Sequence, residues 1–231
     1  MAPHDLKNSH EGETCIVIGN GISLKDVPLE FLKSHPSLGC NRIFMLEDFI
    51  PTYYSLSGNT QVEGLEQLEI ARSYVKKVTE KGGSAFVNRN SLQSFHGLNR
   101  TYGILSVAPN DVPQKGKFSY TPLWSIGVLG TQTYVNLQLA YWMGFTTALL
   151  VGIDHDYGSD NRHFYPEDEF PATLFETEVR DFAEELIQRH KADLAYVRAQ
   201  CAWEADGRRI INLTSGTREE IFDKEDLNEW I

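Results

Sequence analysis

The stretch Thr14 to Leu24, TCIVIGNGISL, decides the fold of this 231-residue chain. Its first five residues form a short, largely apolar run, which is typical of a β-strand buried on both faces of a parallel sheet. Gly19 and Gly21 follow at once, and glycine lets the backbone turn sharply and approach a ligand closely. The pattern therefore predicts a strand at 14–18 that leads into a ligand-binding turn.

Strands and helices alternate along the rest of the chain. Apolar runs and helical spacing predict strands near 38–41, 52–56, 84–87, 103–107, 147–153 and 209–213, and helices over 28–33, 62–78, 127–143, 171–206 and 224–231. A helix followed directly by a buried strand, as in 127–153, is the repeating unit of a parallel sheet. We therefore predict an α/β fold with a single Rossmann-like, mostly parallel sheet and helices on both faces.

Composition sets the class of protein. With 41% apolar and 11% aromatic residues, the chain can close one large core. We expect a single α/β domain over 14–231, preceded by a flexible polar arm at 1–13. Since the longest apolar run is far shorter than the roughly 20 residues of a membrane span, we expect a soluble protein with no integral membrane segment.

Net charge and cysteine content limit the binding partners and the cellular compartment that we expect for this protein. A formal net charge of −11, with lysines and arginines scattered along the chain, argues against nucleic acid as a partner. Three widely spaced cysteines fit neither a disulfide framework nor a CxxC metal site. We expect a cytoplasmic protein, at most located at the inner face of the membrane, and the choice between monomer and homo-oligomer stays open.

Polar residues follow several predicted strands at their carboxyl ends, where ligands bind in open parallel sheets. Backbone N–H groups of the turn and the Ser23 hydroxyl are candidates for binding a phosphate, and Asn41 for binding a base or ribose. A plain tight turn and a capping asparagine are the alternatives. The nucleotide-binding candidates are Gly19, Asn20, Gly21, Ser23 and Asn41, with Ser125 and Gly127 at the start of the helix predicted at 127–143.

A second group of candidates follows the strand predicted at 147–153. Asp154-His155-Asp156 sets two carboxylates beside an imidazole, which suits a general base or a divalent cation. His163 is a second candidate base, and Tyr157 a hydrogen-bond donor to a leaving phosphate. A solvated acidic loop with an exposed histidine is the structural alternative.

Several motifs in order resemble a known family. The family groups archaeal 6-hydroxymethylpterin diphosphokinases with bacterial relatives that accompany surface-polysaccharide genes. The resemblance extends from Thr14 to about Trp230 and is carried by Ile18 to Leu24, Cys40 to Ile43, Pro51 to Tyr54, Gly130 to Phe145, Val151 to His155, His163-Phe164 and Ile211 to Thr214.

The opening also resembles, more distantly, that of bacterial sialyltransferases that use CMP-sialic acid. That resemblance implies a cytidine-monophosphate pocket lined by Asn20, Gly21, Ser23 and Asn41, a donor contact at Gly127, and assistance from Tyr157 to phosphate departure. It also implies metal-free, inverting transfer with a histidine base, for which His155 and His163 are the candidates. Two departures are Ile22, where the sialyltransferases have proline, and Ile126, which separates Ser125 from Gly127.

Three hypotheses follow. The first is a glycosyltransferase that passes a CMP-activated acidic sugar to a surface-glycan acceptor and needs no cofactor. The second is a pterin diphosphokinase that uses ATP and Mg²⁺, with Asp154 and Asp156 as the metal ligands. The third is a nucleotide- or sugar-binding module without catalytic activity.

Overall fold

The computed structural model describes residues 3–56, 65–107, 116–156, 163–166 and 182–231. Within these ranges the chain forms one eight-stranded sheet in the order β10-β9-β8-β1-β2-β3-β4-β5. Every neighbouring pair in it is parallel, so the predicted fold class is confirmed. The strands are β1 (Thr14–Ile18), β2 (Ser37–Cys40), β3 (Tyr53–Leu56), β4 (Ser84–Asn88), β5 (Thr101–Ile104), β8 (Thr147–Val151), β9 (Arg209–Asn212) and β10 (Asp223–Lys224).

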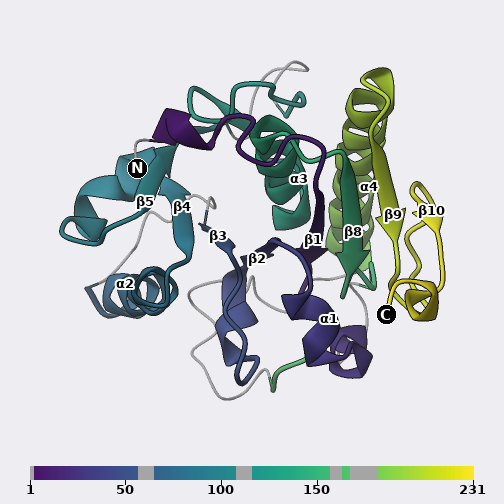
Figure 1. The fold of residues 1–231 in the computed structure, drawn as a ribbon, viewed down its shortest axis with the longest axis horizontal. Coiled ribbons are helices and arrows are strands. Elements are labelled where there is room, and N and C mark those ends of the chain that lie inside the picture. Colours follow the sequence, from purple (N-terminus) through teal and green to yellow (C-terminus); the bar gives the residue numbers. More distant parts are fainter. Residues whose placement is uncertain (1–2, 57–64, 108–115, 157–162, 167–181) are drawn as a thin grey trace.

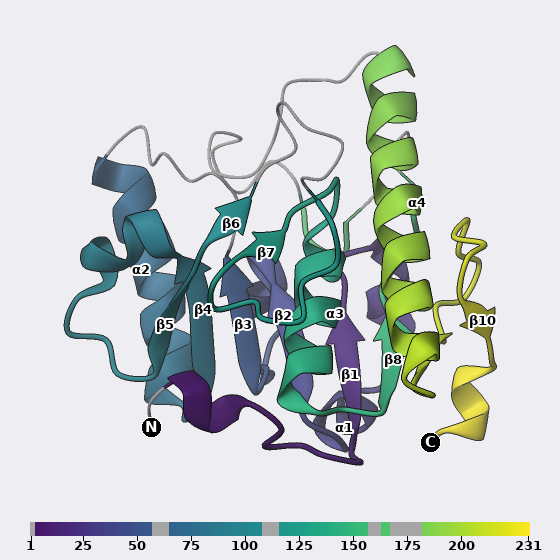
Figure 2. The same ribbon diagram turned by 90° about the horizontal axis from the view of Figure 1, so that it is seen from above.

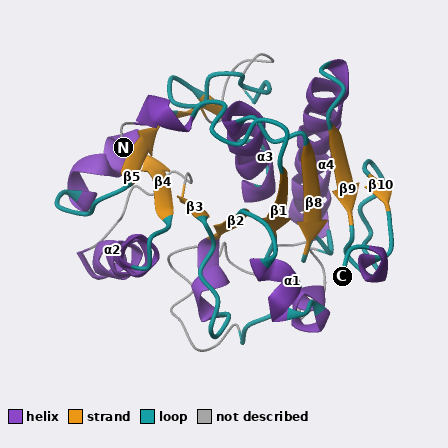
Figure 3. Ribbon diagram, in the orientation of Figure 1, coloured by secondary structure: helices purple, strands orange, loops and turns teal. Residues whose placement is uncertain are grey.

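Helices cover both faces of this sheet, which Figure 1 shows nearly end-on, with the strands in a curved row. On one face lie α1 (Leu29–Lys33) and α2 (Leu65–Glu80), and on the other lie α3 (Gln132–Met143) and α4 (Phe182–Ala205). Figure 3, coloured by secondary structure, shows the same three layers. Each helix layer closes its own apolar core against the sheet, because side chains of successive strand residues point to opposite faces.

The strand order changes direction between β1 and β8. From β1 the chain adds β2 to β5 on one side, and then returns to place β8, β9 and β10 on the other side. Ligands of open parallel sheets bind outside the carboxyl ends of the strands at such a switch point. The turn after β1 and the segment after β8 therefore occupy the predicted ligand edge, toward which the arrows point in Figure 2.

The first residues differ from the flexible arm that we expected. Leu6 is buried, and backbone N–H groups of Asn8 and His10 donate to the last carbonyls of α3, at 3.2 and 2.9 Å. The His10 ring stacks on Phe145, and its Nε2 lies 2.7 Å from the Tyr53 hydroxyl. The arm thus provides donors for carbonyl groups that a helix C-terminus leaves without partners.

Helix α3 begins later than the predicted residue 127. Ile126 and Gly127 form a short strand, β7, which pairs with β6 (Ser106–Val107). Thr131 then caps the helix, since its side chain accepts from the Thr133 N–H at 3.3 Å. The predicted end is confirmed, because Gly144 takes the left-handed conformation that closes helices (φ 98°).

The predicted elements at 103–107 and 224–231 also differ from the observed ones. The predicted strand at 103–107 is divided into β5 and β6 in two different sheets. The predicted helix at 224–231 shortens to β10 and a 3₁₀ turn at Leu227–Glu229, whose start Asp226 caps. None of the helices in the described ranges has the length and apolarity needed to cross a membrane.

One buried glutamine ties the β7 segment to α3. Gln138 is fully buried, and its Oε1 accepts from the N–H groups of Ser119 and Gly127 at 2.9 and 3.0 Å. Its Nε2 donates to the carbonyls of Gly127 and Tyr134, both at 2.9 Å. All the polar atoms of this side chain are therefore paired, as buried polar groups require.

Replacing Gln138 with leucine removes the side-chain partners of the Ser119 and Gly127 N–H groups and of the Gly127 carbonyl, whereas the Tyr134 carbonyl keeps its place in the hydrogen bonding of α3. Since each unsatisfied buried group costs about 1–3 kcal/mol, we expect Gln138→Leu to lower the free energy of unfolding by about 3 kcal/mol or more. Urea denaturation followed by circular dichroism measures this. The control Gln93→Leu changes an exposed glutamine. An equal loss of unfolding free energy in this control would contradict the role of the buried Gln138 hydrogen bonds.

Candidate functional site

The turn after β1 approaches the end of β8 so closely that only glycine fits. The Gly19 N–H donates to Val151 O at 2.8 Å, and the Gly21 N–H donates to Gly152 O at 2.9 Å. A Cβ on Gly19 would lie 2.2 Å from Gly152 O, and one on Gly21 would lie 1.7 Å from Asp154 Oδ2. The glycines predicted to bind a nucleotide are thus required in the first place for this contact between two segments.

Asp154 fastens the turn to β8. Its Oδ2 accepts from the Ser23 hydroxyl at 2.7 Å, and its Oδ1 accepts from the Ser23 N–H at 3.2 Å. Burial raises the pKa of Asp154, while the hydrogen bonds from Ser23 act in the opposite direction. The two groups of Ser23 that we predicted to bind a phosphate, its N–H and its hydroxyl, therefore donate to Asp154. This pair of residues fixes the position of the turn.

Asn20 and Asn41 link the turn to the end of β2. The Asn20 amide donates to Cys40 O at 3.2 Å, whereas its Oδ1 is buried without a hydrogen-bond partner in the described ranges. Asn41 directly follows β2 in a left-handed conformation (φ 50°), which is uncommon outside glycine. An acceptor buried without a donor is costly, so Asn20 Oδ1 is the atom of this turn that most needs a ligand.

The cysteine beneath this pair is not a nucleophile. Cys40 is buried, and burial raises the pKa of its thiol to about 12, so the thiol stays protonated at neutral pH.

His163 closes over the turn from a distant part of the chain. It pairs with Gly21 in an antiparallel bridge, and the next residue, Phe164, donates its N–H to Asn20 O at 3.1 Å. The imidazole is half-buried and stacks on Tyr165, with 4.9 Å between ring centres. The structure thus brings the candidate base His163 to the predicted nucleotide turn.

A buried arginine lies behind this aromatic pair, and sequence reasoning gave it no role. Arg42 is 2% exposed, and its guanidinium lies 5.1 Å from the centre of the Tyr165 ring. A buried cation so close to the strand ends brings positive charge to a strongly acidic chain. Its position next to Asn41, directly after β2, is the sequence signal that marks it.

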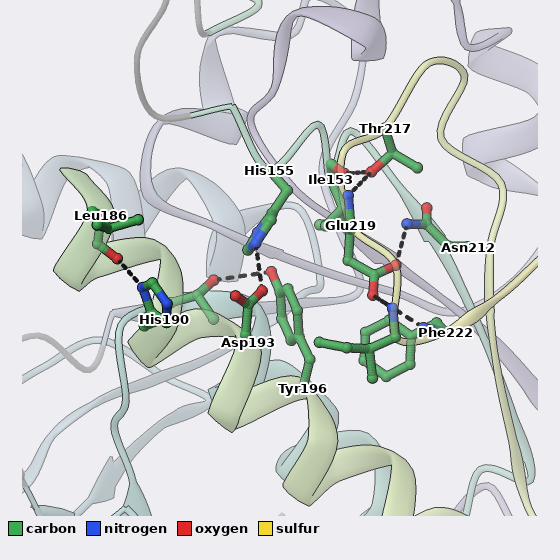
Figure 4. Close-up of polar contacts among 12 residues, drawn as sticks. Ile153, His155, Leu186, His190, Asp193, Tyr196, Asn212, Thr217, Glu219 and Phe222 are labelled. Carbon is green, nitrogen blue, oxygen red and sulfur yellow. Dashed lines mark hydrogen bonds and ion pairs between the residues drawn. The ribbon is translucent and has the colours of Figure 1, made fainter. Parts of the chain in front are cut away.

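His155 has a different setting from His163. It is 6% exposed, and its Nε2 lies 2.8 Å from Asp193 Oδ1 of helix α4, as Figure 4 shows. Its backbone is left-handed (φ 56°), a strain that persists only where neighbouring contacts enforce it. His155 therefore joins the end of β8 to α4 and is turned away from the solvent.

The segment after β9 forms hydrogen bonds with the residues that follow β8. The Thr214 hydroxyl accepts from the Ile153 N–H at 3.0 Å, and the Thr217 hydroxyl donates to Ile153 O at 2.6 Å. The Arg218 N–H donates to Asp154 O at 3.0 Å. The buried carboxylate of Glu219 accepts hydrogen bonds from the Asn212 side chain at 2.9 Å and from the Phe222 N–H at 3.0 Å (Figure 4). These bonds fix the conformation of the segment after β9.

Two predicted residues lie elsewhere, and one is outside the described residues. Ser125 is exposed and precedes β7, so it is not the N-cap of a helix. Both backbone polar groups of Gly127 are taken by Gln138, and α3 begins beyond it, so Gly127 offers no N–H to a donor phosphate. Tyr157 falls outside the described residues.

The carboxylates proposed to hold Mg²⁺ do not fit that role. Asp154 accepts both donors of Ser23, and Asp156 lies 3.2 Å from the Arg218 guanidinium. In the described parts of the chain, no group of three or more His, Cys, Asp or Glu residues could hold a metal ion. The structure therefore lends no support to the metal site of the diphosphokinase hypothesis.

Sequence reasoning missed a polar cluster between β3 and α3. Ser55 donates to Asn136 Oδ1 at 2.6 Å and accepts from Gln132 Nε2 at 2.8 Å. Asn136 is 1% exposed, and its Nδ2 has no partner among the described residues. The sequence feature that could have revealed this cluster is the pair of amides at Gln132 and Asn136, which are four residues apart and hence on one side of the helix.

Three solved structures share this fold, and each of them is a glycosyltransferase. MAf glycosyltransferase from Magnetospirillum magneticum AMB-1 matches with a TM-score of 0.56 and 14% identity, over 95% of this chain and 34% of its own length. Sialyltransferase CstII from Campylobacter jejuni, in complex with the substrate analogue cytidine-5'-monophosphate, matches with 0.56 and 12%, over 93% and 85%. The monofunctional alpha-2,3-sialyltransferase Cst-I from the same organism matches with 0.53 and 13%, over 90% and 78%.

These likenesses show a shared fold. This chain spans about a third of the length of MAf glycosyltransferase and most of the two sialyltransferases. No protein-family model and no curated protein sequence matches the chain. The expected resemblance to sialyltransferases is therefore supported at the level of structure, whereas the resemblance to pterin diphosphokinases stays a prediction.

The contact between the turn and β8 makes a sharp prediction for Gly21→Ala. Because the new Cβ would overlap the Asp154 carboxylate, we expect a loss of at least 2 kcal/mol in the free energy of unfolding. Chemical denaturation measures it. The control Gly207→Ala adds a methyl group in open space at φ +68° and costs about 1 kcal/mol of backbone strain. Equal losses in the two variants would show that the close approach is unimportant.

Proposed function

We propose that this protein is a glycosyltransferase that takes an acidic sugar of the sialic or nonulosonic type from a CMP-activated donor and passes it to a glycan acceptor. The observation that carries the proposal is the meeting of Asn20, Gly21, Asn41 and His163 at the switch point between β1 and β8. The shared fold with CstII, solved with cytidine-5'-monophosphate, supports this choice of nucleotide.

The nucleotide half of the donor has suitable partners at the turn. Asn20 Oδ1 is a buried acceptor that needs a donor, and ribose hydroxyls and the cytosine amino group supply donors. Arg42 adds positive charge near Asn41, which favours a donor that carries both a phosphate and a carboxylate.

The reaction assigned to this site is an inverting displacement. The acceptor hydroxyl oxygen attacks the anomeric carbon of the sugar, the bond from that carbon to the phosphate oxygen breaks, and CMP leaves with the bonding electrons. A general base takes the proton of the attacking hydroxyl, so that charge does not build up on the oxygen. We assign to the positive charge of Arg42 the stabilisation of the negative charge on the leaving phosphate.

His163 is the residue that we assign as the base. The residue is half-buried, and the bridge to Gly21 keeps it beside the turn. His155 is assigned a positioning role, because its buried ring pairs with Asp193 and joins β8 to α4. The two histidines that the sequence offered as candidate bases are thus assigned different roles, His163 as the base and His155 as a positioning residue.

Nucleotide binding is the first test. At 100 times its dissociation constant, CMP should stabilise the protein by about 2.7 kcal/mol and visibly raise the melting temperature, with or without Mg²⁺. The comparison set is CDP, UDP, GDP, ADP and ATP. A shift with ATP that depends on Mg²⁺, and none with CMP, would replace the proposal by the diphosphokinase hypothesis.

The second test separates binding from catalysis. We expect His163→Ala to lower kcat for sugar transfer from a CMP-linked donor by about 100- to 10,000-fold, with the CMP-induced thermal shift retained. The matched control His96→Ala removes an exposed loop histidine and should change neither quantity. Wild-type protein that binds CMP but transfers no sugar to any glycan acceptor would point to a non-catalytic binding module.

A further inference from the structure

Helix α3 buries two side-chain amides, and the fold satisfies only one of them. Gln138 forms four hydrogen bonds with neighbouring backbone groups. Asn136 is just as deeply buried, at 1% exposed, yet its Nδ2 has no hydrogen-bond partner in the described parts of the chain. Because a buried donor without an acceptor lowers stability, Asn136 Nδ2 is an atom that needs an acceptor from a ligand.

The Ser55 hydroxyl fixes the direction in which this amide points. Ser55 Oγ accepts from Gln132 Nε2 at 2.8 Å and donates its own proton to Asn136 Oδ1 at 2.6 Å. The Asn136 Nδ2 therefore points away from Ser55. Gln132 is the first residue of α3 and is only partly buried, so the cluster of Ser55, Gln132 and Asn136 meets the surface at the Gln132 side chain.

This cluster is continuous with the turn after β1. Ser55 is the register partner of Cys40 in the neighbouring strand β2, and the Cys40 sulfur lies 3.6 Å from the Asn20 amide nitrogen. Since neighbouring strands are about 4.8 Å apart, the cluster on β3 lies roughly 10 Å from the end of β1. A sugar joined to a phosphate at the turn can span this distance, so the cluster lies within reach of the sugar half of a donor.

The surroundings of Asn136 indicate which ligand group would fit. Ser55, Gln132 and Asn136 carry no charge, and the buried Cys40 and Phe86 flank Ser55 in register on the same face of the sheet. Asn136 also lies in the second turn of α3, beyond the reach of the partial positive charge at the helix start. A carboxylate would lose its hydration here without a compensating charge. One donor in apolar surroundings suits a group with a single carbonyl oxygen and an apolar remainder.

We propose that Asn136 selects the donor sugar, by donating a hydrogen bond from Nδ2 to the carbonyl oxygen of an N-acyl substituent on the sugar ring. This inference rests on the proposed function, because it concerns the sugar half of the same CMP-linked donor. A donor with a hydroxyl in place of the acylamino group leaves Nδ2 unpaired and binds more weakly, as at other sites built to pair a polar group of the substrate.

The donor preference of the wild-type protein is the first test. Isothermal titration calorimetry without an acceptor gives dissociation constants for CMP, for CMP-N-acetylneuraminic acid, and for its analogue with a hydroxyl in place of the acetylamino group. We expect the acetylamino donor to bind about tenfold more tightly than the analogue. Equal affinity for the two donors, as a buried water on Nδ2 would give, refutes this inference but leaves the proposed function intact if CMP binds. If CMP does not bind, both fail.

A double variant assigns the preference to Asn136. Ser55→Ala combined with Asn136→Leu removes both partners of the buried hydrogen bond, so urea denaturation should show an unchanged or higher stability. The affinity for the acetylamino donor should fall about tenfold, to that of the analogue, while the affinity for CMP stays the same. The control Asn99→Leu changes an exposed asparagine and should alter none of these quantities. A double variant that keeps the donor preference, or that is much less stable than the wild type, would show that the amide serves the fold alone.

Discussion

The close approach between the turn after β1 and the end of β8 is the constraint on which the rest of the site depends. Gly19 and Gly152 bring two backbones into contact, and Asp154 then holds Ser23 with two hydrogen bonds. Because the strand order reverses between these two strands, the contact lies where a parallel sheet opens toward a ligand. The contact leaves Asn20 at the edge with an acceptor to satisfy.

Much of the fold could be predicted, because strands buried on both faces leave a clear apolar signal. The strands predicted at 14–18 and 147–153 correspond to the neighbours β1 and β8, of which β8 ends two residues earlier than predicted, and Gly144 ends α3 as expected. The start of α3 could not be found in this way. Residues 126 and 127 belong to a strand pair whose partner lies about twenty residues earlier, and local spacing carries no information about such a pairing.

The site was predictable in its composition but not in the division of roles. The sequence predicted that Gly21, Asn41 and His163 lie at one edge of the sheet. It did not show that both donors of Ser23 form hydrogen bonds with Asp154. It also treated His155 and His163 as equivalent, although one ring is buried against Asp193 and the other is half-buried beside the turn. Such differences arise from tertiary contacts, and a list of residue types does not contain them.

The hydrogen bonds between the segment after β9 and the residues after β8 have a consequence for the order of folding. Thr214, Thr217 and Arg218 hold the backbone of Ile153 and Asp154, so the end of β8 is completed by residues that come some sixty positions later in the sequence. During synthesis the edge at the end of β8 can take its final shape only after these residues have left the ribosome. A folding intermediate that lacks them would already hold the central strands, but the backbone after β8 would lack these hydrogen bonds.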